Sequence, residues 1–206
     1  MNDLESRYGS NYEELRLYPE QSQVIPTILG AIGAVIGVIP GCLLWVLLGR
    51  FGFVSTVTGM VMAVGVFAAY MFMSKLGGVD SPNKACFVIC LIVIVAAVYI
   101  SARIVYINNI VDAINEAIPQ MKAECIQKLT EAGWSSEEIS AQLTDEFIRD
   151  YLCEQFGIRE ITVSECSRKF SSLLEILELR GSYIMNIAEC YLFSIVGIGV
   201  LAAKFK

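Results

Sequence analysis

The chain has 206 residues, of which 55% are hydrophobic and 17% charged, and its formal net charge is −6. Soluble domains carry about 25% charged residues, so the low charge content argues against a purely soluble protein. The negative net charge argues against nucleic-acid binding, and seven cysteines are too few for a disulfide scaffold.

Charged residues are missing from long stretches rather than thinned evenly. Residues 21–49, 51–74 and 85–102 contain no Asp, Glu, Lys or Arg, and residues 182–203 contain only Glu189. About 20 apolar residues of helix cross the hydrocarbon core of a bilayer. We therefore predict an integral membrane protein with four transmembrane helices, at Val24–Leu48, Phe53–Ser74, Ala85–Tyr106 and Tyr183–Ala203.

The flanks of the early stretches fit this prediction. Residues 1–20 hold five acidic and two basic side chains, whereas a signal peptide begins with a basic region. Residues 49–52 form a short join, as in a helical hairpin. Ser81-Pro82 is a suitable start for the third helix, because proline is tolerated in the first turn of a helix.

One segment, between the third and fourth spans, has an ordinary charge content. Residues 109–181 hold 14 acidic and 7 basic side chains, a net charge of −7. Helical spacing of their apolar residues predicts about three amphipathic helices. These helices either form a small bundle that buries its own apolar stripes, or leave one stripe to dock a partner or lie on the membrane. Anionic lipid repels an acidic face, which disfavours the membrane.

Turn and capping residues mark the ends of these helices. Pro119 predicts a break or bend in the first helix, and Gly133 its end. Ser135 is a good N-cap for the second helix, which Gly157 ends. The second helix is expected to align one set of apolar residues: Ile139, Leu143, Phe147, Ile148, Tyr151 and Leu152.

The third helix is expected to start at an N-cap, Thr162 or Ser164, and Gly181 separates it from the last span. The predicted fold is therefore all-α, a four-helix transmembrane protein with a small amphipathic helical subdomain inserted between spans three and four. Its parts are a polar N-terminal segment (1–23), three transmembrane helices (24–108), the acidic subdomain (109–181), and a fourth transmembrane helix with a short basic tail (182–206).

An even number of spans places both termini on one side of the membrane and residues 109–181 on the other. In short segments, six Lys or Arg lie on the terminal side and two on the other side. Positive charges of short segments favour the cytoplasm, so we expect cytoplasmic termini and an extracytoplasmic subdomain. Cys125, Cys153 and Cys166 would then lie where disulfides form, and whether two of them pair stays open.

Glu189 is the sharpest candidate for a functional residue, because a charge inside a span is costly and by default indicates function. Asn186 lies about one turn before it, and Arg103 and Arg50 are expected on the same side of the membrane. One interpretation is an Arg103–Glu189 ion pair, and another is a protonated acid that is hydrogen-bonded to Asn or Tyr. The functional alternative is proton or cation handling.

Small residues recur in the first span at Gly33, Gly37 and Gly41, a spacing that lets helix backbones approach closely. Pro40 should bend this helix, because it cannot donate a backbone hydrogen bond. The pattern has three alternative uses, which are packing against the second span, homo-oligomerisation, and a broken-helix substrate site.

Other chemistry has little support. The chain has no histidine, which is the commonest acid–base and metal-binding residue. It also lacks CxxC, P-loop, GxSxG and HExxH motifs. We therefore expect no catalytic residue, metal or cofactor.

The spans contain several stretches that together form a characteristic layout: Gly33–Gly41 with Leu44-Trp45 and Gly49, Gly59 and Tyr70 with Leu76-Gly77-Gly78, Tyr99–Tyr106, and Tyr183–Gly197. In this layout the chain resembles uncharacterised small four-pass membrane proteins of Gram-positive bacteria. The resemblance implies a multi-pass protein of the cell membrane and no known activity.

The function that fits best is a non-enzymatic interaction or structural component. Its expected partners are the lipid bilayer and either a second copy of the chain or another membrane protein, and not nucleic acid. The alternative is a small transporter or channel subunit that uses Glu189.

Overall fold

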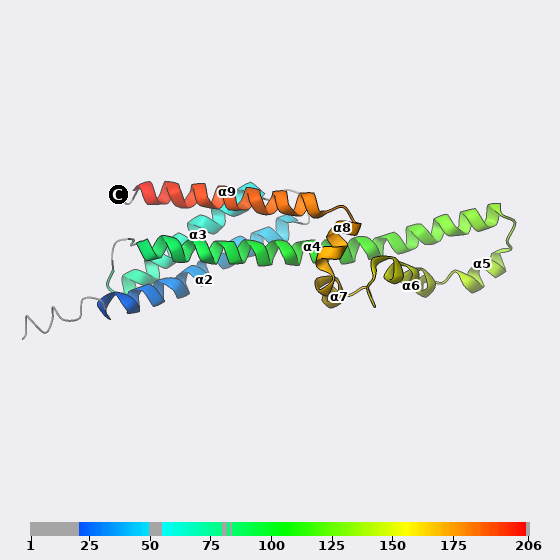
Figure 1. Cartoon of the computed structure of the whole chain (residues 1–206), viewed down its shortest axis with the longest axis horizontal. Helices are drawn as coiled ribbons and strands as arrows, with labels where there is room; N and C mark the ends of the chain where they lie inside the picture. Colours follow the sequence, from blue (N-terminus) through cyan, green and yellow to red (C-terminus); the bar gives the residue numbers. More distant parts are fainter. Residues whose placement is uncertain (1–20, 50–54, 80–81, 83, 205–206) are drawn as a thin grey trace, which may run out of the picture. The chain divides into compact units, whose positions relative to one another are not determined.

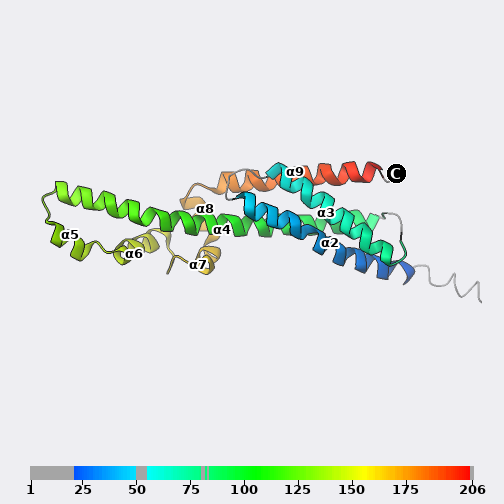
Figure 2. The same ribbon diagram turned by 180° about the vertical axis from the view of Figure 1, so that it is seen from behind.

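The computed structural model describes residues 21–49, 55–79, 82 and 84–204. Its helices, shown from opposite sides in Figures 1 and 2, are α2 (Gln21–Gly49), α3 (Ser55–Leu76), α4 (Lys84–Glu131), α5 (Ser136–Gln142), α6 (Asp145–Phe156), α7 (Val163–Arg168), α8 (Phe170–Ile176) and α9 (Arg180–Lys204). No strand occurs in these residues, which confirms the predicted all-α class.

Four of these helices, α2, α3, α4 and α9, are long and apolar enough to cross a membrane, and they correspond to the four predicted spans. The chain is therefore a membrane protein. Residues 50–52 of the predicted hairpin turn and most of the N-terminal segment lie outside the described residues.

The chain forms two compact units. The first contains the described residues up to Ile100 and from Ile187 onward, and the second contains Ser101–Asn186. Both α4 and α9 contribute residues to each unit.

The first unit exposes many large aliphatic side chains, and small residues are among those at its buried helix contacts, as in helices packed in lipid. Helices α2 and α3 lie side by side in both views (Figures 1 and 2). Ala34 and Ala63 are completely buried in this unit, whereas Ile25 and Ile92 are 65% and 62% exposed. An aqueous protein with this distribution would aggregate, so the outward face of the unit is suited to hydrocarbon.

Helix α4 continues through Pro119, so the helix does not break there, and the bend that the sequence also allowed stays a prediction. Its 48 residues span roughly 72 Å at about 1.5 Å each, more than twice the roughly 30 Å hydrocarbon core of a bilayer. An apolar stripe explains the continuity, because its members are at most 5% exposed: Ile107, Ile110, Ile114 and Ile118. Burying this stripe contributes about 6–12 kcal/mol, which exceeds the cost of about 3 kcal/mol for a proline inside a helix.

The segment after Gly133 contains two helices, α5 and α6, where the sequence predicted one. Ser135 is the N-cap of α5, as predicted, and it forms a capping box with Glu138. The chain leaves the helix at Leu143, and the Thr144 hydroxyl accepts the Phe147 N–H at 3.1 Å, which starts α6. The threonine N-cap explains why one helix ends and another begins here. Its side chain accepts a hydrogen bond from a backbone N–H of the first turn, which has no partner within the helix.

The apolar residues of α6 occupy both buried and exposed positions. In α6, Ile148 and Leu152 are 2% and 4% exposed, but Phe147 and Tyr151 are 56% and 47% exposed. The apolar residues that the sequence aligned therefore divide into a buried pair, Ile148 and Leu152, and an exposed pair, Phe147 and Tyr151. Gly157 ends α6 with a left-handed backbone (φ 62°), as predicted.

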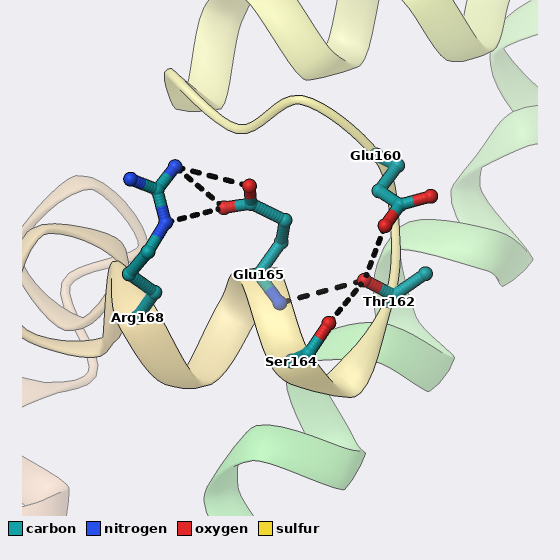
Figure 3. Close-up of polar contacts among 5 residues, drawn as sticks. All are labelled: Glu160, Thr162, Ser164, Glu165 and Arg168. Carbon is teal, nitrogen blue, oxygen red and sulfur yellow. Dashed lines mark hydrogen bonds and ion pairs between the residues drawn. The ribbon is translucent and has the colours of Figure 1, made fainter.

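Thr162 is the N-cap of α7, as the sequence allowed (Figure 3). Its hydroxyl oxygen accepts the Glu165 N–H at 3.4 Å, and it donates to the Glu160 carboxylate, also at 3.4 Å. Arg168 then holds the Glu165 carboxylate with Nε and Nη2 at 2.9 and 2.8 Å. These contacts stabilise the short helix α7. The third helix that the sequence predicted is divided at Lys169 into α7 and α8.

Gly181 lies inside α9 and does not separate it from the preceding helix, contrary to the prediction. The turn after α8 is made instead by Glu178, which has a left-handed backbone with φ 55°. The N–H of Leu179 donates to the carbonyl of Leu174 at 2.9 Å and closes this turn.

Candidate functional site

Arg103 is fixed by contacts with the end of α7 and the start of α8 inside the second unit. Its Nη2 donates to the carbonyl oxygen of Ser167 at 2.8 Å and to the Ser167 hydroxyl at 3.4 Å. The guanidinium carbon lies 5.4 Å from the centre of the Phe170 ring, a cation–π distance. Helix α4 therefore carries a half-buried cation that holds the α7–α8 junction.

Asn186 joins the same group of side chains from α9. Its amide nitrogen donates to the Tyr106 hydroxyl at 2.7 Å. Tyr106 meets Tyr183 edge-to-face with ring centres 5.1 Å apart, and Tyr183 meets Phe170 in the same way at 5.2 Å. Such edge-to-face contacts are favourable beyond the burial of area alone.

We call these residues the Arg103–Asn186 cluster: Arg103, Tyr106, Ser167, Phe170, Tyr183 and Asn186. The cluster ties α4, the α7–α8 junction and α9 together through side chains that are far apart in the sequence. It contains one cation, aromatic rings and an amide, a composition suited to holding helices in place. Sequence reasoning singled out Arg103 and Asn186 but missed Ser167 and Phe170.

Glu189 lies in the first unit, whereas Arg103 belongs to the second. The Glu189 side chain is half-buried on α9. The Arg103–Glu189 ion pair remains a prediction, and Arg50 lies outside the described residues.

Polar contacts hold α9 around Glu189. The Tyr191 hydroxyl donates to the carbonyl oxygen of Val95 on α4 at 3.0 Å, and the Ser194 hydroxyl donates to the carbonyl of Gly59 on α3 at 3.1 Å. A methyl group on Gly59 would lie 2.7 Å from the Cys190 carbonyl oxygen, so the α3 and α9 backbones are close. These contacts satisfy hydroxyl groups that lipid cannot hydrogen-bond.

Gly33, Gly37 and Gly41 of α2 all face α3. A methyl group on Gly33 would lie 2.7 Å from Met73 Cγ, and one on Gly41 would lie 3.1 Å from Met62 Cα. The structure thus uses the small-residue pattern for contact inside the chain. Pro40 is exposed on α2, and the helix continues through it.

Two thiols of the second unit, those of Cys153 and Cys166, are poorly suited to reaction. Cys153 and Cys166 are free and buried, and burial raises the pKa of both thiols. Because the thiolate is the reactive form, a raised pKa suppresses nucleophilic chemistry at neutral pH. Among the described residues, no three of His, Cys, Asp or Glu are grouped so that they can hold a metal ion.

Comparison with known proteins found no matching family model, no similar curated protein and no similar solved structure.

Proposed function

We propose that the protein is an interaction or structural component of the membrane, and that its acidic second unit docks a partner protein. The observation that carries this proposal is the distribution of aromatic residues. The second unit buries an apolar core of its own, yet Trp134, Phe147 and Tyr151 are 42%, 56% and 47% exposed. Exposed aromatic side chains are typical of the residues that dominate protein–protein interfaces.

The packing of the first unit supports a role as an anchor. The glycine face of α2 contacts α3, so it is occupied within one chain. Because this glycine face already packs against α3, we expect the chain to contact a partner through other surfaces and not through the glycine face. A second copy of the chain or another membrane protein is the proposed partner, and the bilayer surrounds the first unit.

The proposed orientation has cytoplasmic termini and residues 109–181 outside the cytoplasm, in a multi-pass protein of a bacterial cell membrane. The excess of Lys and Arg in short segments on the terminal side supports this orientation. The likeness in layout to small four-pass proteins of Gram-positive bacteria supports the cellular setting.

A transporter or channel subunit is the second candidate. One observation favours it, the half-buried carboxyl group of Glu189 in the apolar helix α9. Ionisable residues in such positions often line the pathways of protons or cations.

Purification from native membranes combined with a flux assay separates the two candidates. We expect the full chain to leave the membrane as an oligomer or with a stoichiometric partner, measured by native mass spectrometry. A monomer without a partner would contradict the interaction proposal. In proteoliposomes, cation or proton flux that is lost in Glu189→Gln and kept in Glu175→Gln would instead establish the transport alternative.

A further inference from the structure

Helix α6 presents a stripe of exposed aromatic and acidic residues. Phe147, Asp150, Tyr151 and Glu154 follow the spacing i, i+3, i+4, i+7, which places them on one side of a helix. All four are exposed. We call these four residues the α6 stripe.

The α6 stripe lies on a firmly held helix. The other side of α6 is buried through Ile148, Leu152 and Cys153, which are 2%, 4% and 8% exposed. Thr144 caps the start of the helix and Gly157 caps its end. The stripe is therefore ordered before any partner arrives, which lowers the entropic cost of binding.

Among the residues that the structure describes, the carboxylates of the stripe form no ion pair. Lys122 contacts Asp145 at the start of α6, with 2.6 Å between Nζ and Oδ1, and this contact lowers the pKa of the Asp145 carboxyl group. Neither Asp150 nor Glu154 has a cation within 4.0 Å among the described residues. Arg149 is two positions from both Phe147 and Tyr151, so helical spacing turns it away from the stripe.

We propose that the α6 stripe binds a cationic, Lys- or Arg-rich segment of a partner protein. This inference rests on the docking function proposed above and names its surface and its partner chemistry. The rings of Phe147 and Tyr151 offer cation–π contacts, and the carboxylates of Asp150 and Glu154 flank them with ion pairs. The net charge of −7 on residues 109–181 attracts a cationic partner and repels an anionic lipid surface.

The test uses the full chain in nanodiscs of zwitterionic phospholipid. The probe is a fluorescent amphipathic lysine–leucine peptide, its control is the glutamate–leucine counterpart, and binding is read by anisotropy. We expect the lysine peptide alone to bind. Two double variants should each weaken binding of the lysine peptide by about tenfold. One removes the rings, with Phe147→Ser and Tyr151→Ser, and the other removes the charges, with Asp150→Asn and Glu154→Gln.

A matched variant separates the stripe from general attraction between opposite charges. Glu137→Gln with Glu175→Gln removes the same charge from exposed positions on α5 and α8, and binding should change by less than about twofold. Equal losses in both charge variants would overturn the proposal, as would absence of peptide binding or binding of the protein to anionic vesicles instead. Circular dichroism establishes that each variant is folded.

The outcome is distinguishable from failure of the docking function itself. If the full chain co-purifies with a partner and the Asp150→Asn, Glu154→Gln variant keeps that partner at full occupancy, the α6 stripe is the wrong surface while the docking function stands. If no partner co-purifies but the lysine peptide still binds the α6 stripe as expected, the α6 stripe is a binding surface for cationic segments, and the proposed docking function is contradicted.

Discussion

Replacement of Gly37 by alanine tests how closely α2 and α3 approach. The added methyl group would lie against the Gly65 carbonyl oxygen and 2.6 Å from the Ala69 Cβ, about 0.8 Å inside the 3.4 Å at which ordinary contact begins. The Gly65 oxygen belongs to backbone, so the helices must separate rather than a side chain rotate. Overpacking of this kind costs about 1–3 kcal/mol.

Gly199 provides the matched control. It also lies inside a helix, but among the described residues no atom beyond its chain neighbours and the backbone of its own helix lies within 4 Å of the methyl group that alanine would add. Both substitutions gain about 1 kcal/mol of helix propensity, so the difference between the variants isolates the packing cost. We expect Gly37→Ala to be less stable than Gly199→Ala by about 1–3 kcal/mol.

The assay is equilibrium unfolding in mixed micelles with increasing SDS. In a Trp134→Phe background, Trp45 fluorescence reports on the first unit, because its side chain is 2% exposed there. A Gly37→Ala variant that unfolds at the same or a higher SDS fraction than Gly199→Ala would refute close backbone packing between α2 and α3.

Three further predictions concern the second unit. Arg103→Gln removes the hydrogen bonds to Ser167 and should destabilise the α7–α8 region by about 2 kcal/mol, seen as faster amide hydrogen exchange there; unchanged exchange would contradict the role of Arg103. The Ser135 hydroxyl and backbone N–H donate to the Glu138 carboxylate and lower its pKa below the ordinary 4.5. The stability that this ionised carboxylate gives α5 is therefore complete above pH 4.5 and is lost as the pH falls through the lowered pKa. The amide chemical shift of Ser135 should titrate with a midpoint below pH 4.5, and a midpoint at or above that value would contradict the prediction. Gly157→Ala forces a side chain into a left-handed backbone and should cost about 1–2 kcal/mol in thermal unfolding, whereas equal stability would show that the backbone relaxes.

The membrane helices were predictable because their signal is carried by composition. Helices that cross a bilayer exclude charge over about 20 residues, and no long-range contact is needed to recognise them. Local caps were predictable for a similar reason. Ser135, Gly157 and Thr162 act within three or four residues of their own position, so each is visible in a short window of sequence.

The internal breaks of the second unit depended on weaker or unusual signals. Thr144 interrupts an apolar pattern that otherwise continues, and nothing in the pattern shows that its hydroxyl caps a new helix. Glu178 adopts a backbone that usually belongs to glycine, so the neighbouring Gly181 drew the prediction instead. At Pro119 the helix continues because burial of the isoleucine stripe stabilises it by more than the proline destabilises it, and this burial depends on tertiary packing.

The site was predictable only in part, because its partners are distant in sequence. Arg103 and Asn186 stood out as polar residues beside apolar spans. Their contacts with Ser167 and Tyr106 join positions 64 and 80 residues apart, and a single sequence does not reveal such pairs. The exposure of Phe147 could not be predicted either, because helical spacing grouped it with Ile148 and Leu152, which are buried.

Site-directed cysteine labelling tests the central claim of four crossings with the acidic segment on the side opposite the termini. In a background without the seven native cysteines, Arg149→Cys and Ser10→Cys are exposed in turn to a membrane-impermeant maleimide, using intact cells and inverted vesicles. The account predicts that Arg149→Cys reacts only in intact cells and Ser10→Cys only in inverted vesicles. Reaction of both positions from the same side would contradict four crossings.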